Sequence, residues 1–448
     1  MLHMLRYKNN PLLLGTLLLT ATGLVTRVIG FFFRIFISHR FGEEAMGIYQ
    51  LLGPLLSLSF AVTAAGIQTA LSRYAAREKA AGNGQKARTY LCTGALFTLS
   101  LSLLISLLLY GQAEALSLFY LKEPRCAPLL RICSLSLPFA ALQSCLRGYC
   151  YGLKKTALPA CTQLVEQTVR VGSVFLLCFF LEEQGQQPAV TLLAVGMVLG
   201  DAAAFLTSFF SLYKELGGTQ EGAPLFSFRY LKDLLTLSLP LTVNRLILSL
   251  LGSFEAASIP QGLRLYGYAS ETALSIYGVL TGMAFSLVFF PSAFTNSAAV
   301  LLLPLVSEAQ STGNYRRIKK TIAQALMFSL TLGLFFTLLF FVFGRFLGDL
   351  LFGSMLAGTF IRTLSFLCPF LYLHTTLSSI LQGLGKVGTG FLINVTALGI
   401  RLGCVLFLIP KIGIQGYLWG MLLGELFSSF FFYFCIKKEL IRFSRRKT

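Results

Sequence analysis

The sequence predicts an all-α membrane protein of about twelve transmembrane helices, arranged as two homologous six-helix lobes around a central cavity. Hydrophobic residues make up 55% of the 448 residues, and charged residues make up only 12%, about half the share usual in soluble proteins. Apolar runs of about 20 residues, the length that crosses a hydrocarbon core, recur along the chain. The second part of the chain also repeats features of the first.

Apolar runs between clusters of charge define the candidate spans. In the first half they lie near residues 11–38, 46–70, 89–111, 127–147, 158–181 and 189–213. In the second half they lie near residues 230–252, 273–306, 321–344, 356–381, 387–409 and 414–436. The run at 273–306 exceeds the length of one span, so we expect it to be tilted or kinked near Pro291. We divide the chain into an N-terminal lobe, residues 1–216, and a C-terminal lobe, residues 217–448.

The basic residues follow the alternation of the spans. Of the 37 Lys and Arg residues, 24 lie in the connections on one side of the predicted membrane and six in those on the other side. Short cytoplasmic connections are enriched in Lys and Arg, so we expect a multi-pass protein of the cytoplasmic membrane with both termini in the cytoplasm. The net charge of +19 is then mostly a topology signal, and we expect no nucleic-acid partner.

An internal repeat supports two related halves. A constant offset of 231 residues relates Arg131, Pro138, Lys155 and Arg170 to Arg362, Pro369, Lys386 and Arg401. Because each half holds an even number of spans, both halves enter the membrane in the same direction and should be related by an axis along the membrane normal. The substrate path is expected between such halves, which would work by alternating access.

The remaining seven basic residues are arginines inside predicted spans: Arg27, Arg34, Arg131, Arg170, Arg245, Arg362 and Arg401. An arginine facing lipid at mid-membrane costs roughly 3 kcal/mol, so these side chains should face protein or a wet cavity. Arg131 and Arg362 lie near span ends, where they can extend toward the interface. We expect substrate contact from the other five, which are Arg27, Arg34, Arg245, Arg170 and Arg401.

Acidic residues inside the predicted spans are fewer, and Glu166, Asp201 and Glu425 are the clear cases. The interior therefore keeps a surplus of positive charge that an anionic ligand would neutralise, and guanidinium groups bind phosphate oxygens through forked hydrogen bonds. Asp201 and Glu425 occupy equivalent places in the two halves. The three acids either pair with arginines or take part in ion coupling and gating.

No pattern in the sequence indicates an enzyme. The stretch Gly383–Lys386 lacks the spacing of a phosphate-binding loop. The ten Cys residues are scattered through apolar segments without His partners, so we expect packing roles for them and no metal site. We expect no cofactor, and coupling to Na⁺, H⁺ or the membrane potential stays open. His374 is expected to be an ordinary packed hydrogen-bonding residue.

Two blocks of sequence resemble a known family. The first runs from Arg27 through Arg34 and continues over Phe41–Gln50, and the second covers Tyr277–Ala284, Phe289–Pro291 and Leu303–Ala309. They are similar to the polysaccharide biosynthesis and stage V sporulation protein B family. This family belongs to the flippase superfamily that also includes lipid II flippases and multidrug and toxin extruders.

The resemblance implies a two-lobed flippase for undecaprenyl-pyrophosphate-linked sugars, either a peptidoglycan precursor, such as one for the spore cortex, or another polysaccharide repeat unit. Arg27 is the position of this sequence that best matches the cationic cavity residues of the family. The expected partners are a lipid-linked anionic substrate and membrane lipids, with cell-wall synthesis enzymes as candidate protein partners. The alternative is a cation-coupled multidrug exporter on the same fold.

Overall fold

The computed structural model describes residues 11–216, 226–311 and 315–445, and the described residues form helices without any strand. Eleven of these helices are long and apolar enough to cross a membrane. The first of them, α2 (Pro11–Thr63), contains the predicted span 11–38 and most of 46–70. The predicted separation of these two spans is confirmed, because α2 comprises two helices that meet at a kink at Gly42, where φ is 80° and ψ is 178°.

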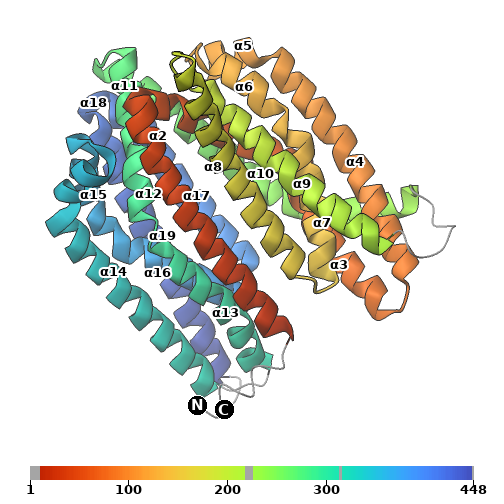
Figure 1. Cartoon of the computed structure of the whole chain (residues 1–448). Coiled ribbons are helices and arrows are strands. Elements are labelled where there is room, and N and C mark those ends of the chain that lie inside the picture. The colour runs from red at the N-terminus through yellow and green to blue at the C-terminus, as the bar shows by residue number, and fades with distance from the viewer. Residues whose placement is uncertain (1–10, 217–225, 312–314, 446–448) are drawn as a thin grey trace. The chain divides into compact units, whose positions relative to one another are not determined.

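Residue contacts divide the chain into two compact units (Figure 1). The first comprises Met1–Phe33 and Leu51–Ser253, and the second comprises Arg34–Gln50 and Phe254–Thr448. Two long helices, α2 and α10 (Phe228–Tyr266), contribute residues to both units. The contact boundary within α10 therefore differs from the predicted lobe boundary at residues 216 and 217, which was drawn from the repeat.

The first unit is built from long helices that pack through small and apolar side chains. Its remaining helices are α3 (Ala65–Ala80), α4 (Gly84–Gly111), α5 (Ala113–Ala115), the π-helical turn η1 (Leu116–Tyr120), α6 (Cys126–Ser134), α7 (Ser136–Gly152), α8 (Ala157–Glu183) and α9 (Thr191–Leu216). A buried cluster between α3, α4 and α7 includes Leu71, Tyr90 and Tyr149. Helices α7 and α8 both pack against α9.

The second unit contains the predicted kink. Its remaining helices are α11 (Ser270–Gly278), the π-helix η2 (Val279–Ala284), α12 (Phe285–Val288), α13 (Ser292–Ser311), α14 (Tyr315–Phe352), α15 (Met355–Leu364), η3 (Ser365–Leu367), α16 (Cys368–Gly383), α17 (Val387–Phe407), α18 (Ile409–Ile412) and α19 (Ile414–Arg445). The expected interruption near Pro291 is confirmed, because the helix ends at Val288 and a new one begins at Ser292. Leu377, Ile380 and Phe432 form part of its buried core.

The sequence repeat reappears in the helix ends. Helix α7 ends at Gly152 and α16 ends at Gly383, a difference of 231 residues. The pair α8 and α9 in the first unit corresponds to α17 and α19 in the second, and the members of each pair pack against each other. Each unit therefore carries one copy of the same helix pair.

A close crossing joins α2 and α11 within the second unit. A Cβ atom on Gly47 would lie 2.1 Å from the Leu274 carbonyl oxygen, and one on Gly278 would lie 2.4 Å from the Gly47 nitrogen. The backbones are thus in direct contact, as small residues allow in membrane helices. A Cβ on Gly282 would likewise meet the Met46 side chain at 2.2 Å.

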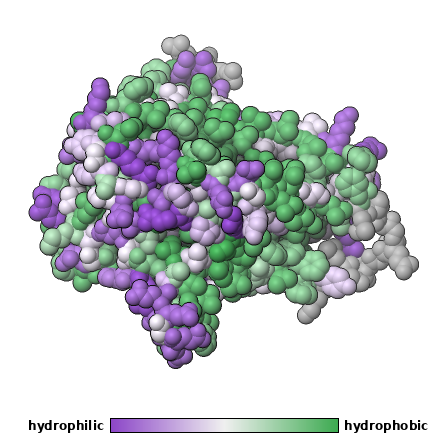
Figure 2. All heavy atoms as spheres, turned by 90° about the horizontal axis from the view of Figure 1, so that it is seen from above, coloured by the Kyte–Doolittle hydropathy of each residue, from purple (hydrophilic) through white to green (hydrophobic). Residues whose placement is uncertain are grey.

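The surface is rich in hydrophobic side chains, with hydrophilic residues gathered in patches (Figure 2). On α14, for example, Leu334, Leu338 and Phe346 are each more than half exposed. A soluble protein rarely exposes such a continuous apolar face, whereas a bilayer would cover it.

Candidate functional site

Four charged side chains form a chain of ion pairs in the first unit. Arg170 on α8 contacts Glu166 one turn earlier at 3.1 Å and Asp201 on α9 at 2.9 Å. Arg147 on α7 pairs with the other oxygen of Glu166 at 2.5 Å. The cluster holds two arginines and two carboxylates, so its charges balance when all four are ionised. Arg147 lies near the end of α7, which continues to Gly152.

Local sequence explains why this cluster forms. Residues four apart share a helix face, which brings Glu166 and Arg170 together. Gly200 allows α9 to approach α8 closely, because a Cβ there would lie only 2.8 Å from the Glu166 carbonyl oxygen. Asp201 follows directly and reaches Arg170. Of the two alternatives left open for Asp201, the ion pair with an arginine is present in this structure.

The corresponding arginine of the second unit has a different partner. Arg401 on α17 donates two hydrogen bonds to Glu255 on α10, at 2.9 and 2.6 Å. The Glu255 side chain is only 4% exposed. Sequence reasoning missed Glu255 because the predicted span ended at residue 252, whereas α10 continues to Tyr266. The low charge density between Arg245 and Arg264 could have indicated that the helix extends past residue 252.

Glu425 pairs with a histidine and not with an arginine, which was one of the two alternatives for it. Its Oε2 atom lies 2.7 Å from Nδ1 of His374 on α16. The other ring nitrogen, Nε2, lies 3.1 Å from Oδ1 of Asn394 on α17. His374 therefore holds α16, α17 and α19 together through one ring, a larger role than the sequence suggested.

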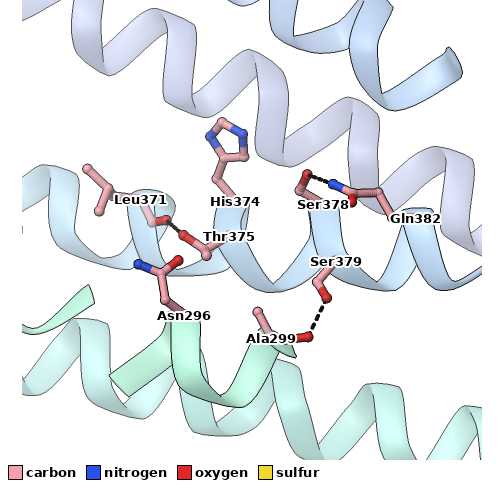
Figure 3. A pocket seen from close by; sticks show the side chains of 8 residues that line it. All are labelled: Asn296, Ala299, Leu371, His374, Thr375, Ser378, Ser379 and Gln382. Atoms are coloured by element: carbon pink, nitrogen blue, oxygen red, sulfur yellow. Dashed lines mark hydrogen bonds between the residues drawn. The ribbon is translucent and has the colours of Figure 1, made fainter. Parts of the chain in front are cut away.

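A pocket with several polar side chains lies beside this histidine, between α13 and α16 (Figure 3). Its volume is about 480 Å³, within the range of small-molecule sites. The residues that line it are Asn296, Ala299, Leu371, His374, Thr375, Ser378, Ser379 and Gln382. All of them belong to the second unit.

Three of the predicted substrate-binding arginines have no acidic partner in the described part of the chain. Arg27 and Arg245 are exposed, and Arg34 is half-buried. By contrast, Arg170 and Arg401 are both neutralised by carboxylates. The described contacts therefore separate the five predicted arginines into two groups.

The two arginines near span ends find other contacts. Arg131 pairs with the exposed Glu114 at 2.7 Å. The Arg362 guanidinium lies 4.6 Å from the centre of the Phe341 ring, a cation–π contact. Within residues 11–216, 226–311 and 315–445 we find no group of three His, Cys, Asp or Glu side chains suited to a metal ion.

The arrangement of the helices defines the class of protein. An inward-facing multidrug resistance MATE family transporter of the MOP superfamily matches with a TM-score of 0.75 at 15% identity, over 94% of this chain and 96% of that one. A MOP superfamily transporter from Pyrococcus furiosus matches with a TM-score of 0.68 at 14% identity, over 98% and 97%. This is a multi-pass membrane protein with the fold of MOP superfamily transporters, which confirms the predicted fold class.

Sequence comparison narrows the class to a family. The model described as polysaccharide biosynthesis protein matches residues 12–310, and the MatE model matches residues 263–405. The chain belongs to the polysaccharide biosynthesis protein family. It is 30% identical to stage V sporulation protein B of Bacillus subtilis (strain 168) over 90% of this chain and 79% of that protein. It is 24% identical to sporulation protein YkvU of the same organism, over 96% of each.

A third relative carries a name that states an activity. The lipid II flippase MurJ of Bacillus subtilis is 21% identical over 71% of this chain and 62% of that protein. The family resemblance predicted from the sequence is confirmed by these matches.

Proposed function

We propose that this protein is a flippase that moves an undecaprenyl-pyrophosphate-linked oligosaccharide across the cytoplasmic membrane by alternating access, with both chain termini in the cytoplasm. The family description and the relative named as a lipid II flippase support this cargo class. The two relatives named as sporulation proteins favour a peptidoglycan precursor, such as one for the spore cortex, over other polysaccharide repeat units. Membrane lipids and cell-wall synthesis enzymes are the partners that this role would require.

The observation that carries the proposal is the unbalanced positive charge within the spans. Arg27, Arg34 and Arg245 lie on apolar helices and have no carboxylate partner in the described residues. Each costs roughly 3 kcal/mol if it faces lipid alone. A pyrophosphate offers several anionic oxygens to forked guanidinium donors, while its lipid tail stays in the bilayer.

The paired arginines take a different part in the proposal. Arg170 and Arg401 already hold carboxylates, so they would reach a substrate only by exchanging those partners. We assign Glu166, Asp201 and Glu425 to gating or ion coupling. A charged substrate that replaces one partner of such a pair would release the contact between the helices that the pair joins, so substrate binding and helix rearrangement would be linked.

The proposal is tested by lipid binding to the full-length protein, measured by native mass spectrometry. The probe is undecaprenyl-pyrophosphoryl-N-acetylglucosamine. Arg27→Ala should weaken binding about tenfold, the effect of losing one charge-assisted hydrogen bond. Arg131→Ala is the matched control, because Arg131 pairs with Glu114, and it should bind as the wild type does. Unchanged binding in Arg27→Ala, or equal loss in the control, would contradict the proposal.

The alternative function is cation-coupled export of drugs on the same fold, which the MatE match over residues 263–405 favours. A cationic drug needs an acid that is free to bind it. The four deep acids of the described spans, Glu166, Asp201, Glu255 and Glu425, each have a basic partner. Efflux of a cationic dye by cells that express the protein, lost in Glu425→Gln, would favour export over lipid flipping.

A further inference from the structure

The pocket between α13 and α16 has a composition that points to a particular ligand chemistry. Six of its eight lining residues are polar: Asn296, His374, Thr375, Ser378, Ser379 and Gln382. None of the eight is Lys, Arg, Asp or Glu. The pocket therefore offers hydrogen-bonding groups, and none of its lining residues is an acid, a lysine or an arginine.

The internal hydrogen bonds show which groups remain available. Thr375 donates to the Leu371 carbonyl at 3.0 Å and Ser379 donates to the Ala299 carbonyl at 2.6 Å, so both hydroxyl oxygens keep lone pairs to accept from a ligand. The amide of Asn296 has no hydrogen-bond partner among the described residues, and in Figure 3 it points toward Thr375. Donors and acceptors thus face the same space.

His374 supplies no free charge to this space. Glu425 and Asn394 occupy its two ring nitrogens. In Figure 3 its ring points away from Asn296 on α13. The contact of His374 with Glu425 is therefore directed toward α19, and the hydroxyl and amide groups are the ones that remain available in the pocket.

We infer that this pocket is the subsite for the uncharged saccharide portion of the cargo. A sugar presents many hydroxyl groups, each both donor and acceptor, and these match the mixed groups of Asn296, Thr375 and Gln382. A pyrophosphate binds more favourably to arginines, which this pocket lacks. An isoprenoid tail would bury the polar groups of the pocket without giving them hydrogen-bond partners. The inference rests on the proposed function and extends it, because it assigns the sugar specificity to the second unit.

The test compares two probes on the full-length protein: undecaprenyl pyrophosphate and undecaprenyl-pyrophosphoryl-N-acetylglucosamine. Wild type should bind the second more tightly. Asn296→Ala and Thr375→Val should each reduce this preference by roughly fivefold, as expected for one hydrogen bond, and should leave binding of the bare pyrophosphate unchanged. Thr396→Val is the matched control, because Thr396 makes the same hydrogen bond to the carbonyl four residues earlier and lies on α17 outside the pocket.

The outcomes separate this inference from the proposed function. If neither probe binds to the wild type, the proposed function is wrong, and the saccharide subsite, which rests on it, is wrong too. If both probes bind equally, or if Asn296→Ala weakens both to the same extent, the flippase proposal stands and the saccharide subsite is wrong. Loss of the preference in Thr396→Val would also contradict the subsite.

Discussion

At the scale of single residues, the molecule is organised by how each intramembrane charge is neutralised. The two units meet this requirement differently, although they share a sequence repeat. Arg170 bonds to the acid on the next long helix, Asp201. Its repeat counterpart Arg401 bonds instead to Glu255, which leaves Glu425 to His374. The position that corresponds to His374 in the first unit is Gln143, whose amide is buried without a hydrogen-bond partner among the described residues.

The pair of Arg401 and Glu255 gives a prediction for stability. Glu255→Ala leaves a largely buried guanidinium without its carboxylate and should cost about 3–5 kcal/mol. The double variant Glu255→Ala with Arg401→Met should lose clearly less, because no charge remains unpaired. Thermal unfolding of the purified protein measures both effects. Glu114→Ala is the control, since it removes an exposed pair with Arg131 that contributes at most about 1 kcal/mol. Equal losses in the single and double variants would contradict this account.

The predictability of these contacts depended on their separation in the sequence. Glu166 and Arg170 could be paired in advance, because a spacing of four residues on a helix fixes their proximity. Glu255 and Arg401 are 146 residues apart, and no local pattern relates them. The same holds for His374 and Glu425, which meet only because α16 packs against α19. Local periodicity could therefore identify the charged residues but not most of their partners.

At the scale of elements, α2 shows how short the connection between two predicted spans is. The predicted connection at residues 39–45 is reduced to a kink at Gly42, with helix on both sides of it. Glu43 is held by two hydroxyl groups, since Ser275 and Ser354 donate to its two carboxylate oxygens at 2.7 and 2.5 Å. The Glu43 carboxylate is thus held by other residues of the second unit, and the kink at Gly42 separates the two helices that make up α2.

The backbone at Gly42 makes this kink sensitive to substitution. Its φ of 80° with ψ of 178° is a conformation that essentially only glycine adopts. No neighbouring atom lies within 4 Å of a Cβ placed there, so Gly42→Ala should destabilise through backbone strain alone, by roughly 1–3 kcal/mol. Chemical or thermal unfolding of the purified protein checks the value.

Gly23 provides the control on the same helix. A Cβ there also meets nothing within 4 Å, but the residue has helical backbone angles and is not followed by proline. Gly23→Ala should therefore leave stability unchanged or raise it by up to about 1 kcal/mol. If both alanine variants behave alike, the kink at Gly42 does not require glycine.

At the scale of the whole molecule, the basic residues predict how the chain is threaded through the membrane. With 24 Lys and Arg in alternate connections against six in the others, the connection at 153–156 should face the cytoplasm and the connection at 184–190 should face outside. Alkaline phosphatase, which is active only outside the cytoplasm, should be active when inserted at residue 186 and inactive when inserted at residue 155. The reverse result would invert the predicted topology.

The order of long helices was predictable at this scale because hydrophobic length is a property of each segment alone. Most predicted spans correspond to one helix, such as 158–181 within α8 and 387–409 over α17. The predicted spans 127–147 and 356–381 are each subdivided into two helices, and a proline of the repeat lies in the first turn after each break, Pro138 in α7 and Pro369 in α16. Hydropathy alone does not reveal these breaks, because the apolar run continues across them.

The glycine crossing of α2 with α11 explains what the two blocks used for family assignment encode. Gly47 belongs to the first block and Gly278 to the second, and their backbones are in contact. The Phe41–Gln50 part of the first block and the Tyr277–Ala284 part of the second are therefore the two sides of one packing surface, and residues on either side should change together among relatives. A search with these two parts collects proteins that share this crossing regardless of their cargo, whereas cargo should be sorted by positions outside the crossing, such as Arg27 and Asn296. Grouping relatives by those positions would divide the family by substrate.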